Sequence, residues 1–168
     1  EGISAHGPVA VLHANRVLVC SPAARDEGVR RGLRKREAQG RCPQLVVVDH
    51  DPGRDARAFE PVVAAVAELA PGVEVVRPGV LAVAARGPVR YYGGPEAAAE
   101  RLVEHIAQAC AVEAQVGIAD GIFAAVLAAR AGRVVEPGET TAFLAELNIA
   151  AIGRPPLVDL LRRLGIGT

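Results

Sequence analysis

The 168-residue sequence predicts a mixed α+β fold, and two patterns support this prediction. Short runs of β-branched residues, bounded by glycine, proline and asparagine, are typical of strands. Longer segments repeat apolar residues at helical spacing, which is typical of helices that bury one face. Because the two kinds of segment alternate along the chain, we expect neither an all-α nor an all-β protein.

The first half of the chain begins with an expected hairpin. Its strands are residues 9–12 and 16–20, with a tight turn at Ala14-Asn15. Ser21 followed by Pro22 then has the form of an N-cap and a first helical position. The further elements expected here are short helices at 22–28 and 33–39, a strand at 45–48 and a long helix at 55–69.

The second half begins with another expected hairpin, at 73–76 and 80–84, whose turn is Pro78-Gly79. The glycines and tyrosines at 91–94 predict a loop before a helix that starts at Pro95. The later elements expected are a strand at 114–118, a helix at 121–130, a strand at 133–135, and helices at 140–147 and 157–164.

Composition favours a soluble, cytoplasmic protein. No apolar run reaches the roughly 18 residues of a membrane span, and residues 1–11 lack the pattern of a signal peptide. Cys20, Cys42 and Cys110 are odd in number and have no CxxC spacing, so we expect reduced, buried thiols. A reactive thiol at Cys42, near basic residues, is the alternative to structural burial.

Charge is unevenly distributed although the formal net charge is zero. Between Arg16 and Arg41 eight basic residues stand against three acidic ones. Such a run can follow a DNA backbone through salt-sensitive phosphate contacts, or it can simply be a solvated helical face. It contains no aromatic residue, so it offers no platform for base stacking.

A second polar cluster consists of Asp49, His50, Asp51 and Asp55. Three carboxylates and an imidazole at this spacing suit either a metal ion or an ordinary turn with a helix cap. We favour the turn and assign no metal ligands.

Three segments, in this order, resemble Y-family DNA polymerases. Residues 20–32 (CSPAARDEGVRRG) are similar to the fingers motif ANYEARxxGVxxGM. Residues 115–119 (QVGIA) resemble the VGIS strand end. Residues 147–150 (LNIA) with 161–166 (LRRLGI) are similar to the passage that enters the thumb. Together with the connections between them, these segments span nearly the whole chain.

Further phrases most resemble the ImuB type of this family, namely 35–39 (KREAQ), 57–61 (RAFEP), 76–79 (VRPG) and 90–93 (RYYG). The resemblance implies a palm, with a mixed or antiparallel sheet and helices on one face, and a small fingers subdomain. It places the fingers at 14–50, the palm at 1–13 and 51–140, and the truncated start of a thumb-like module at 141–168. The first catalytic strand of the palm, with its DxDxFF motif, is not visible.

Polymerase chemistry needs carboxylates that hold two metal ions close together. Aligned on the family's SIDE motif, the Asp-Glu pair becomes Gly79 and Val80, and no acidic residue occurs between Glu74 and Glu96. Arg77 would moreover repel divalent cations. We therefore predict an inactive homologue with no catalytic residues and no cofactor; magnesium belongs only to the active alternative.

The resemblance also implies a DNA-binding fingers surface. Arg25 matches the family's phosphate-binding arginine, although Pro22 replaces its tyrosine partner, and Arg130 is the one cation left on the helix after 115–119. Nucleotide binding is therefore in doubt. The basic residues that we expect to contact DNA are Arg25, Arg30, Arg31, Arg34, Lys35, Arg36 and Arg41.

The expected function is that of a non-catalytic adaptor in error-prone translesion synthesis and SOS-type mutagenesis. By resemblance its partners are primer–template DNA, a DnaE-type polymerase, a RecA-like ImuA partner and the sliding clamp, mostly through regions outside this chain. The protein would be cytoplasmic and nucleoid-associated, with no membrane partner. The alternatives are an active polymerase whose carboxylates lie on missing segments, and a protein-interaction domain without a nucleic-acid role.

Overall fold

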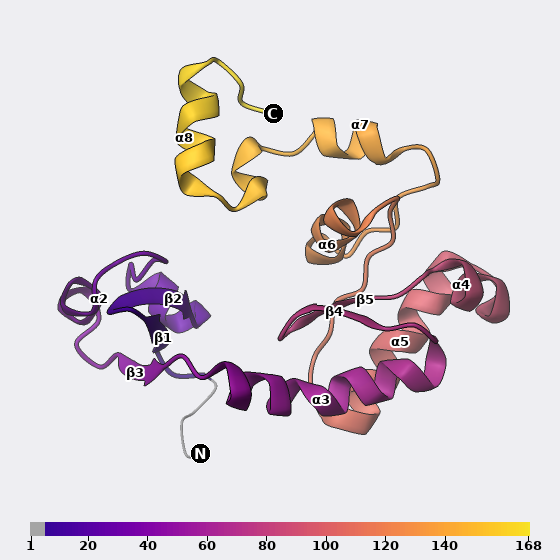
Figure 1. The fold of residues 1–168 in the computed structure, drawn as a ribbon, viewed down its shortest axis with the longest axis horizontal. Helices are drawn as coiled ribbons and strands as arrows, with labels where there is room; N and C mark the ends of the chain where they lie inside the picture. The colour runs from indigo at the N-terminus through magenta and orange to yellow at the C-terminus, as the bar shows by residue number, and fades with distance from the viewer. Residues whose placement is uncertain (1–5) are drawn as a thin grey trace. The chain divides into compact units, whose positions relative to one another are not determined.

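The computed structural model describes residues 6–168, which divide into two compact units on either side of Asp55. The first unit contains β1 (Val9–His13), β2 (Arg16–Cys20), α1 (Pro22–Asp26), α2 (Lys35–Arg41) and β3 (Val46–Asp49). Helix α3 (Pro52–Leu69) starts in the first unit and lies mostly in the second. Figure 1 shows the order of these elements.

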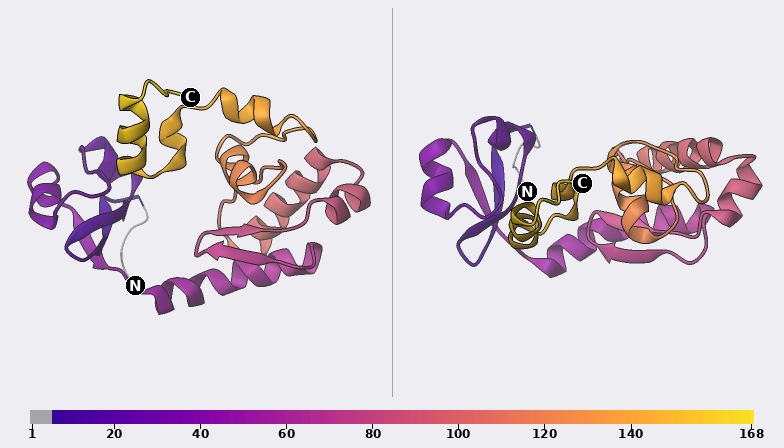
Figure 2. Two further views of the ribbon diagram at one scale, coloured as in Figure 1. Left: turned by 45° about the horizontal axis from the view of Figure 1, so that its top comes forward. Right: turned by 90° about the horizontal axis from the view of Figure 1, so that it is seen from above.

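The first unit is built on a three-stranded sheet in the order β2-β1-β3. β1 pairs antiparallel with β2 and parallel with β3. Ala14 and Asn15 have φ of 48° and 61°, as the tight two-residue hairpin turn requires, so the predicted hairpin is confirmed. Helix α2 packs beside β2, as the two views in Figure 2 show.

A small apolar core closes this unit. Its buried residues come from every element except β3 and from the connections between the elements: Ala10, Leu12, Val17, Ala24, Val29, Ala38, Cys42 and Leu45. Most of these side chains are small, so helices and sheet can approach closely.

Ser21 joins the sheet to α1. Its hydroxyl oxygen accepts the backbone N–H groups of Val9 at 3.0 Å and Ala24 at 3.3 Å, and it donates to the Gly7 carbonyl at 2.9 Å. We expect Ser21→Ala to lower the free energy of unfolding by about 2 kcal/mol, because a helix cap and two further hydrogen bonds are lost. Urea denaturation measures this. Ser21→Thr, which keeps the hydroxyl, is the control, and equal stability of all three proteins would contradict the prediction.

The second unit contains a two-stranded hairpin and the remaining helices. The hairpin consists of β4 (Glu74–Arg77) and β5 (Val80–Ala82), and the left-handed φ of Gly79, 83°, makes its turn as predicted. The other elements are α4 (Arg86–Tyr92), α5 (Pro95–Cys110), α6 (Ile122–Arg130), α7 (Thr140–Ala145), the 3-10 turn η1 (Ile149–Ile152) and α8 (Pro155–Arg163).

Two apolar cores hold this unit together. In the first, Val66 of α3 packs with Leu102 and Ile106 of α5, and β5 contributes the half-buried Leu81. In the second, Leu127 and Ala128 of α6 pack with Val135 and Phe143. Helices α3 and α5 thus support the hairpin, as Figure 1 shows.

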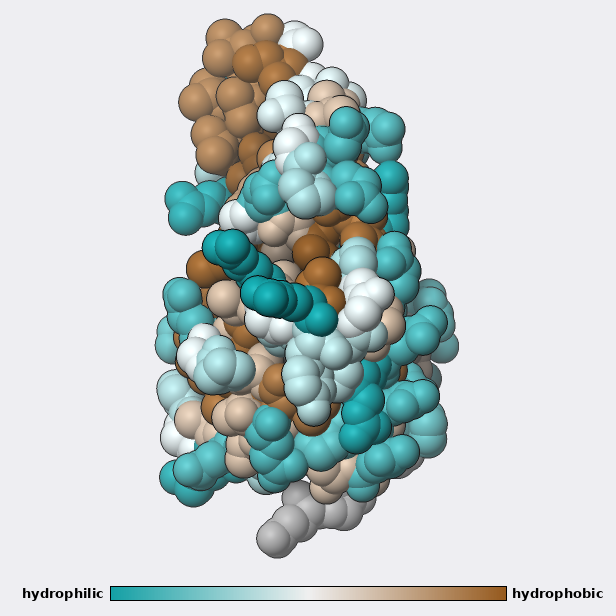
Figure 3. Space-filling model, turned by 90° about the vertical axis from the view of Figure 1, so that its right-hand side faces the viewer, coloured by the Kyte–Doolittle hydropathy of each residue, from teal (hydrophilic) through white to brown (hydrophobic). Residues whose placement is uncertain are grey.

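Helix α8 leaves part of its apolar side uncovered. Val158 is buried, whereas Leu160 and Leu164 are 54% and 67% exposed. Hydrophobic side chains gather at the top of Figure 3, where the end of the chain lies in Figure 1. Within residues 6–168, α8 therefore has only one side packed.

Helix α4 is absent from the sequence-based expectation, which had a loop at residues 91–94. Gly87 and Pro88 lie in the first turn of α4, where proline costs no intrahelical hydrogen bond. Gly93, with φ of 85°, ends the helix. Tyr91 and Tyr92 are therefore helical, with ring centroids 4.9 Å apart.

The strands expected at 114–118 and 133–135 do not form as such. Only an isolated parallel bridge between Ile118 and Val134 is present. Helix α2 also starts two residues later than expected, because the Glu37 carboxylate accepts the backbone N–H of Arg34 at 2.8 Å and fixes the N-terminus there. It continues through Gly40 to Arg41.

Residues 6–13, which the sequence-based division groups with 51–140, lie in the first unit. β1 belongs to the first unit, because its backbone is hydrogen-bonded to β2 and β3 on both sides. Residues 1–5 lie outside the described residues. The division into fingers, palm and thumb stays a prediction.

Candidate nucleic-acid interface

The predicted DNA-binding residues all lie in the first unit, on α1, on α2 and on the connection between them. All seven are exposed, but they fall into two groups that differ in what their side chains bond. This difference separates residues that shape the unit from residues that face solvent.

Three of the seven residues, all arginines, bond carbonyl groups of their own unit. Arg25 donates to the Cys20 carbonyl at 2.7 Å, and Arg41 to the Gly28 carbonyl at 2.8 Å. Arg30 donates to the carbonyls of Val29 and Arg25. A guanidinium has five N–H donors and can still donate some of these hydrogen bonds to a ligand. In this structure, however, the three side chains stabilise the connection between α1 and α2.

Arg16 is a fourth arginine that bonds a carbonyl group of this unit, and the sequence did not predict it. It donates from β2 to the Gly32 carbonyl at 2.9 Å. No local motif marks this residue, since the contact depends on how the connection folds back over the sheet. In the sequence, Arg16 is marked only by being the first residue of the basic run.

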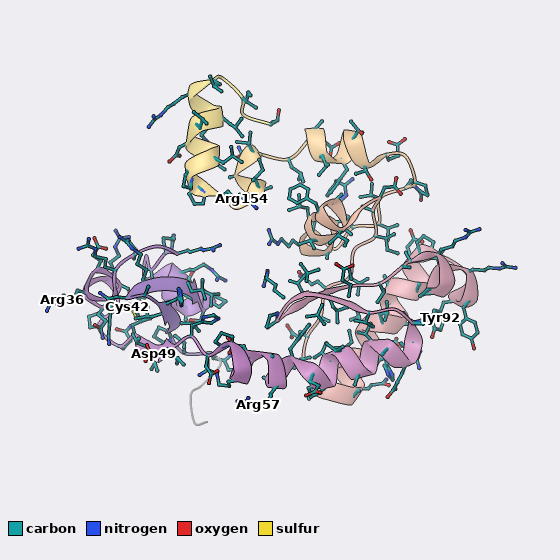
Figure 4. All side chains as sticks on the ribbon, viewed as in Figure 1. Arg36, Cys42, Asp49, Arg57, Tyr92 and Arg154 are labelled. Carbon is teal, nitrogen blue, oxygen red and sulfur yellow. The ribbon has the colours of Figure 1, made fainter. Side chains whose placement is uncertain are left out.

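The other four residues are Arg31, Arg34, Lys35 and Arg36, which we call the basic surface. Among residues 6–168 none of their side chains is in an ion pair. Arg36 projects away from α2 in Figure 4. Arg34, Lys35 and Arg36 occupy the N-cap and first positions of α2, where the helix dipole makes positive charge unfavourable. Such a cost to stability is typical of residues kept for binding.

The hairpin turn of β4 and β5 carries the positions that align with the metal-binding pair. Gly79 forms the turn and Val80 begins β5. The Arg77 guanidinium donates to the Pro78 carbonyl at 3.3 Å and so stays at this turn. In the part of the chain that the structure describes, no group of three or more His, Cys, Asp or Glu residues is placed to hold a metal ion.

The polar cluster of Asp49, His50, Asp51 and Asp55 lies between the end of β3 and the first turn of α3. The Asp51 carboxylate accepts the backbone N–H of Arg54 at 3.0 Å, as a helix cap does. Asp55 pairs with the Arg54 guanidinium at 3.1 Å and lies 3.7 Å from the His50 imidazole. The favoured turn and cap are therefore what these residues form.

Cys42 is fully buried in the first core (Figure 4), as expected for a structural thiol. Burial raises the pKa of its thiol above the ordinary value, and the Glu27 carboxylate adds to the rise. We expect Cys42 to react with a thiol reagent roughly a hundredfold more slowly than the half-buried Cys20 and Cys110. Mass spectrometry after timed labelling checks this, and equal rates at all three cysteines would contradict it. Labelling in denaturant is the control.

The fold places the protein in a known class. It matches DinB from Sulfolobus solfataricus with a TM-score of 0.78, at 22% identity over 97% of this chain and 51% of that chain. An insertion ternary complex of Dbh DNA polymerase matches with a TM-score of 0.79, at 21% identity over 97% of this chain and 52% of that one. The α+β fold is thus that of Y-family DNA polymerases, as the sequence predicted.

The chain belongs to the impB/mucB/samB family, whose model matches residues 4–130. The protein ImuB of two Caulobacter vibrioides strains is 33% identical over 124 residues, which are 72% of this chain and 27% of that protein. The chain therefore spans about a quarter of the length of these relatives. The predicted resemblance to ImuB-type proteins is confirmed. No helix within residues 6–168 is long and apolar enough to cross a membrane.

Proposed function

We propose that this chain is part of a non-catalytic Y-family homologue that binds primer–template DNA weakly through the basic surface. It would act as an adaptor in error-prone translesion synthesis after DNA damage. The observation that carries the proposal is the hairpin turn, where Gly79 and Val80 offer no carboxylate. Without carboxylates there, two-metal nucleotidyl transfer lacks its ligands.

Weak, salt-sensitive binding follows from the charges. The four solvent-facing cations can contact backbone phosphates, and releasing the condensed counterions would provide most of the affinity. The formal net charge of zero argues against tight binding to any polyanion. Sequence preference should be small, since the basic surface has no aromatic side chain to stack on bases.

Partners enter the proposal through the relatives. This chain is similar to the protein ImuB. Proteins of the ImuB type are expected to work with a DnaE-type polymerase, a RecA-like ImuA partner and the sliding clamp. Such contacts would lie mostly outside this chain, in a cytoplasmic, nucleoid-associated complex. No cofactor is proposed. Magnesium would matter only for an active polymerase whose carboxylates lie on other segments. That alternative remains because this chain covers only 51% of the matched DinB chain.

The test combines DNA binding with primer extension in the full-length protein. We expect fluorescence anisotropy to show binding to labelled primer–template that weakens about a hundredfold between 50 and 200 mM salt, the effect of about four phosphate contacts. We expect no extension of the same primer with Mg²⁺ and all four nucleotides. Extension would support the active alternative, and the absence of binding at low salt would favour a protein-interaction module.

A further inference from the structure

A strongly exposed tyrosine lies on helix α4. Tyr91 is 82% exposed, more than any other large hydrophobic residue in the part of the chain that the structure describes. Its ring meets that of the half-buried Tyr92 edge to face, and this contact restricts where the exposed ring can lie. Tyrosine is enriched where proteins contact one another, because its rigid ring buries a large area at a small cost in entropy. The exposed ring of Tyr91 therefore suits a contact with another protein surface.

The exposed side of α4 is held in a fixed position. Pro88 is buried and Val89 is half-buried, and α4 packs against α5. Gly93 ends the helix with a left-handed φ, and the Gly94 N–H donates to the Val89 carbonyl at 2.9 Å. Figure 4 shows Tyr92 at the end of the second unit that lies away from the hairpin turn. A partner bound to α4 would therefore leave that turn uncovered.

Two pairs of like charges lie near this tyrosine along the chain. Arg86 and Arg90 are one helical turn apart on α4, and Glu96 and Glu100 are one helical turn apart on α5. All four residues are exposed, and within residues 6–168 none of their side chains is in an ion pair. The two helices therefore offer two unpaired cations and two unpaired anions, whose charges cancel.

The basic and the acidic pair border each other. Helix α4 ends at Tyr92 and α5 begins at Pro95, so only a short turn separates them. A Cβ atom added at Gly94 would lie 4.0 Å from the Glu96 Oε2, so this carboxylate lies close to the turn. Figure 3 shows the side of the second unit on which α4 lies in Figure 1, where strongly hydrophilic side chains lie beside weakly hydrophobic ones. We call the exposed sides of α4 and of residues 95–100 the α4–α5 surface.

The mixture of signs decides which kind of partner fits the α4–α5 surface. A nucleic acid repeats one negative charge along its length, so it would place phosphates against Glu96 and Glu100. An acidic protein segment would meet the same repulsion. A second copy of this surface, related by a two-fold axis, can place the arginine pair of each copy opposite the glutamate pair of the other. The surface is therefore complementary to itself.

We propose that the α4–α5 surface is the contact between two copies of this protein. Tyr91 of each copy packs against the other copy, and the opposite charges around it fix the orientation of the two copies. Most of the affinity comes from the buried rings, because exposed ion pairs contribute little. The contact consists of two short helical segments from each copy, so the dimer is weak, with a dissociation constant in the micromolar range. It does not depend on DNA binding.

Sedimentation equilibrium of the full-length protein over a range of micromolar concentrations tests the role of the tyrosine. We expect the wild-type protein to dimerise, and Tyr91→Ala to weaken this self-association at least about tenfold, because the ring that is buried in the contact is lost. Phe123→Ala is the matched control, since Phe123 is another exposed aromatic residue of the same unit, on α6, and its loss should leave the dimer unchanged. A wild-type protein that stays monomeric, or equal weakening by both substitutions, would overturn the proposal.

Exchanging the charges tests the complementarity. Arg86→Glu with Arg90→Glu makes the α4–α5 surface wholly acidic, and Glu96→Arg with Glu100→Arg makes it wholly basic. Each double variant alone should be monomeric, because like charges would face each other, whereas an equimolar mixture of the two should form a mixed dimer. Circular dichroism checks that both variants fold. A mixture of folded variants that stays monomeric, or a double variant that dimerises alone as the wild type does, would contradict the proposal.

Discussion

Gly117→Ala should destabilise the second unit by on the order of 3 kcal/mol or more, enough to unfold a marginally stable unit. A Cβ atom at Gly117 would lie 2.0 Å from the backbone nitrogen of Ala129 and 2.4 Å from the carbonyl carbon of Ala128. Both atoms belong to the backbone of α6, so neither can rotate away as a side chain would. The whole helix would have to shift out of its core.

Thermal unfolding followed by circular dichroism measures this effect. Gly87→Ala is the matched control, because Gly87 lies in α4 of the same unit, has no left-handed φ, and leaves open space within 4 Å of an added Cβ. Alanine there should be neutral or stabilising by up to about 1 kcal/mol, since it favours the helix. A Gly117→Ala protein as stable as the control would show that α6 does not approach the 112–119 segment so closely.

Replacing all four residues of the basic surface by alanine should abolish most DNA binding while leaving the fold intact. Each phosphate contact contributes about 0.9 to the slope of log K against log salt, so the slope should fall by between about three and four. Stability should not drop, because Arg34, Lys35 and Arg36 place positive charge at the N-terminus of α2 and alanine is the better helix former. Anisotropy across a salt series and urea denaturation measure the two effects.

Two controls distinguish loss of the basic surface from a general loss of positive charge or of stability. Replacing four exposed arginines on other helices, Arg57, Arg86, Arg90 and Arg163, changes the net charge equally and should leave binding largely unchanged. Arg41→Ala should instead lower the stability by about 1 kcal/mol through the lost bond to the Gly28 carbonyl, with a change in salt slope of at most about one. Equal losses of binding in both four-residue variants would refute the basic surface as the binding site.

The seven basic residues show what the sequence can predict and what it cannot. The sequence identified the run between Arg16 and Arg41, since charge is visible in composition alone. It could not divide the run, because Arg25, Arg30 and Arg41 find their carbonyl partners only when the connection between α1 and α2 folds. The assignment of DNA contacts stays a prediction for all seven.

Local signals also misled in two places. The glycines and tyrosines at 91–94 predicted a loop, yet Tyr91 and Tyr92 belong to α4, which ends at Gly93. The sequence also predicted a strand at 114–118, but a strand is defined by a run of hydrogen bonds to a neighbour, and among the described residues only Ile118 forms a bridge, to Val134.

By itself the sequence determined the α+β class, the two hairpins with their turns, most helices, and the lack of acidic residues around Gly79 and Val80, because these depend on residue type and on contacts close along the chain. Only the tertiary structure decided which arginines brace the first unit and how closely α6 approaches Gly117. The physical reason is that each of these depends on atoms brought together from distant parts of the chain, whose positions no local pattern encodes.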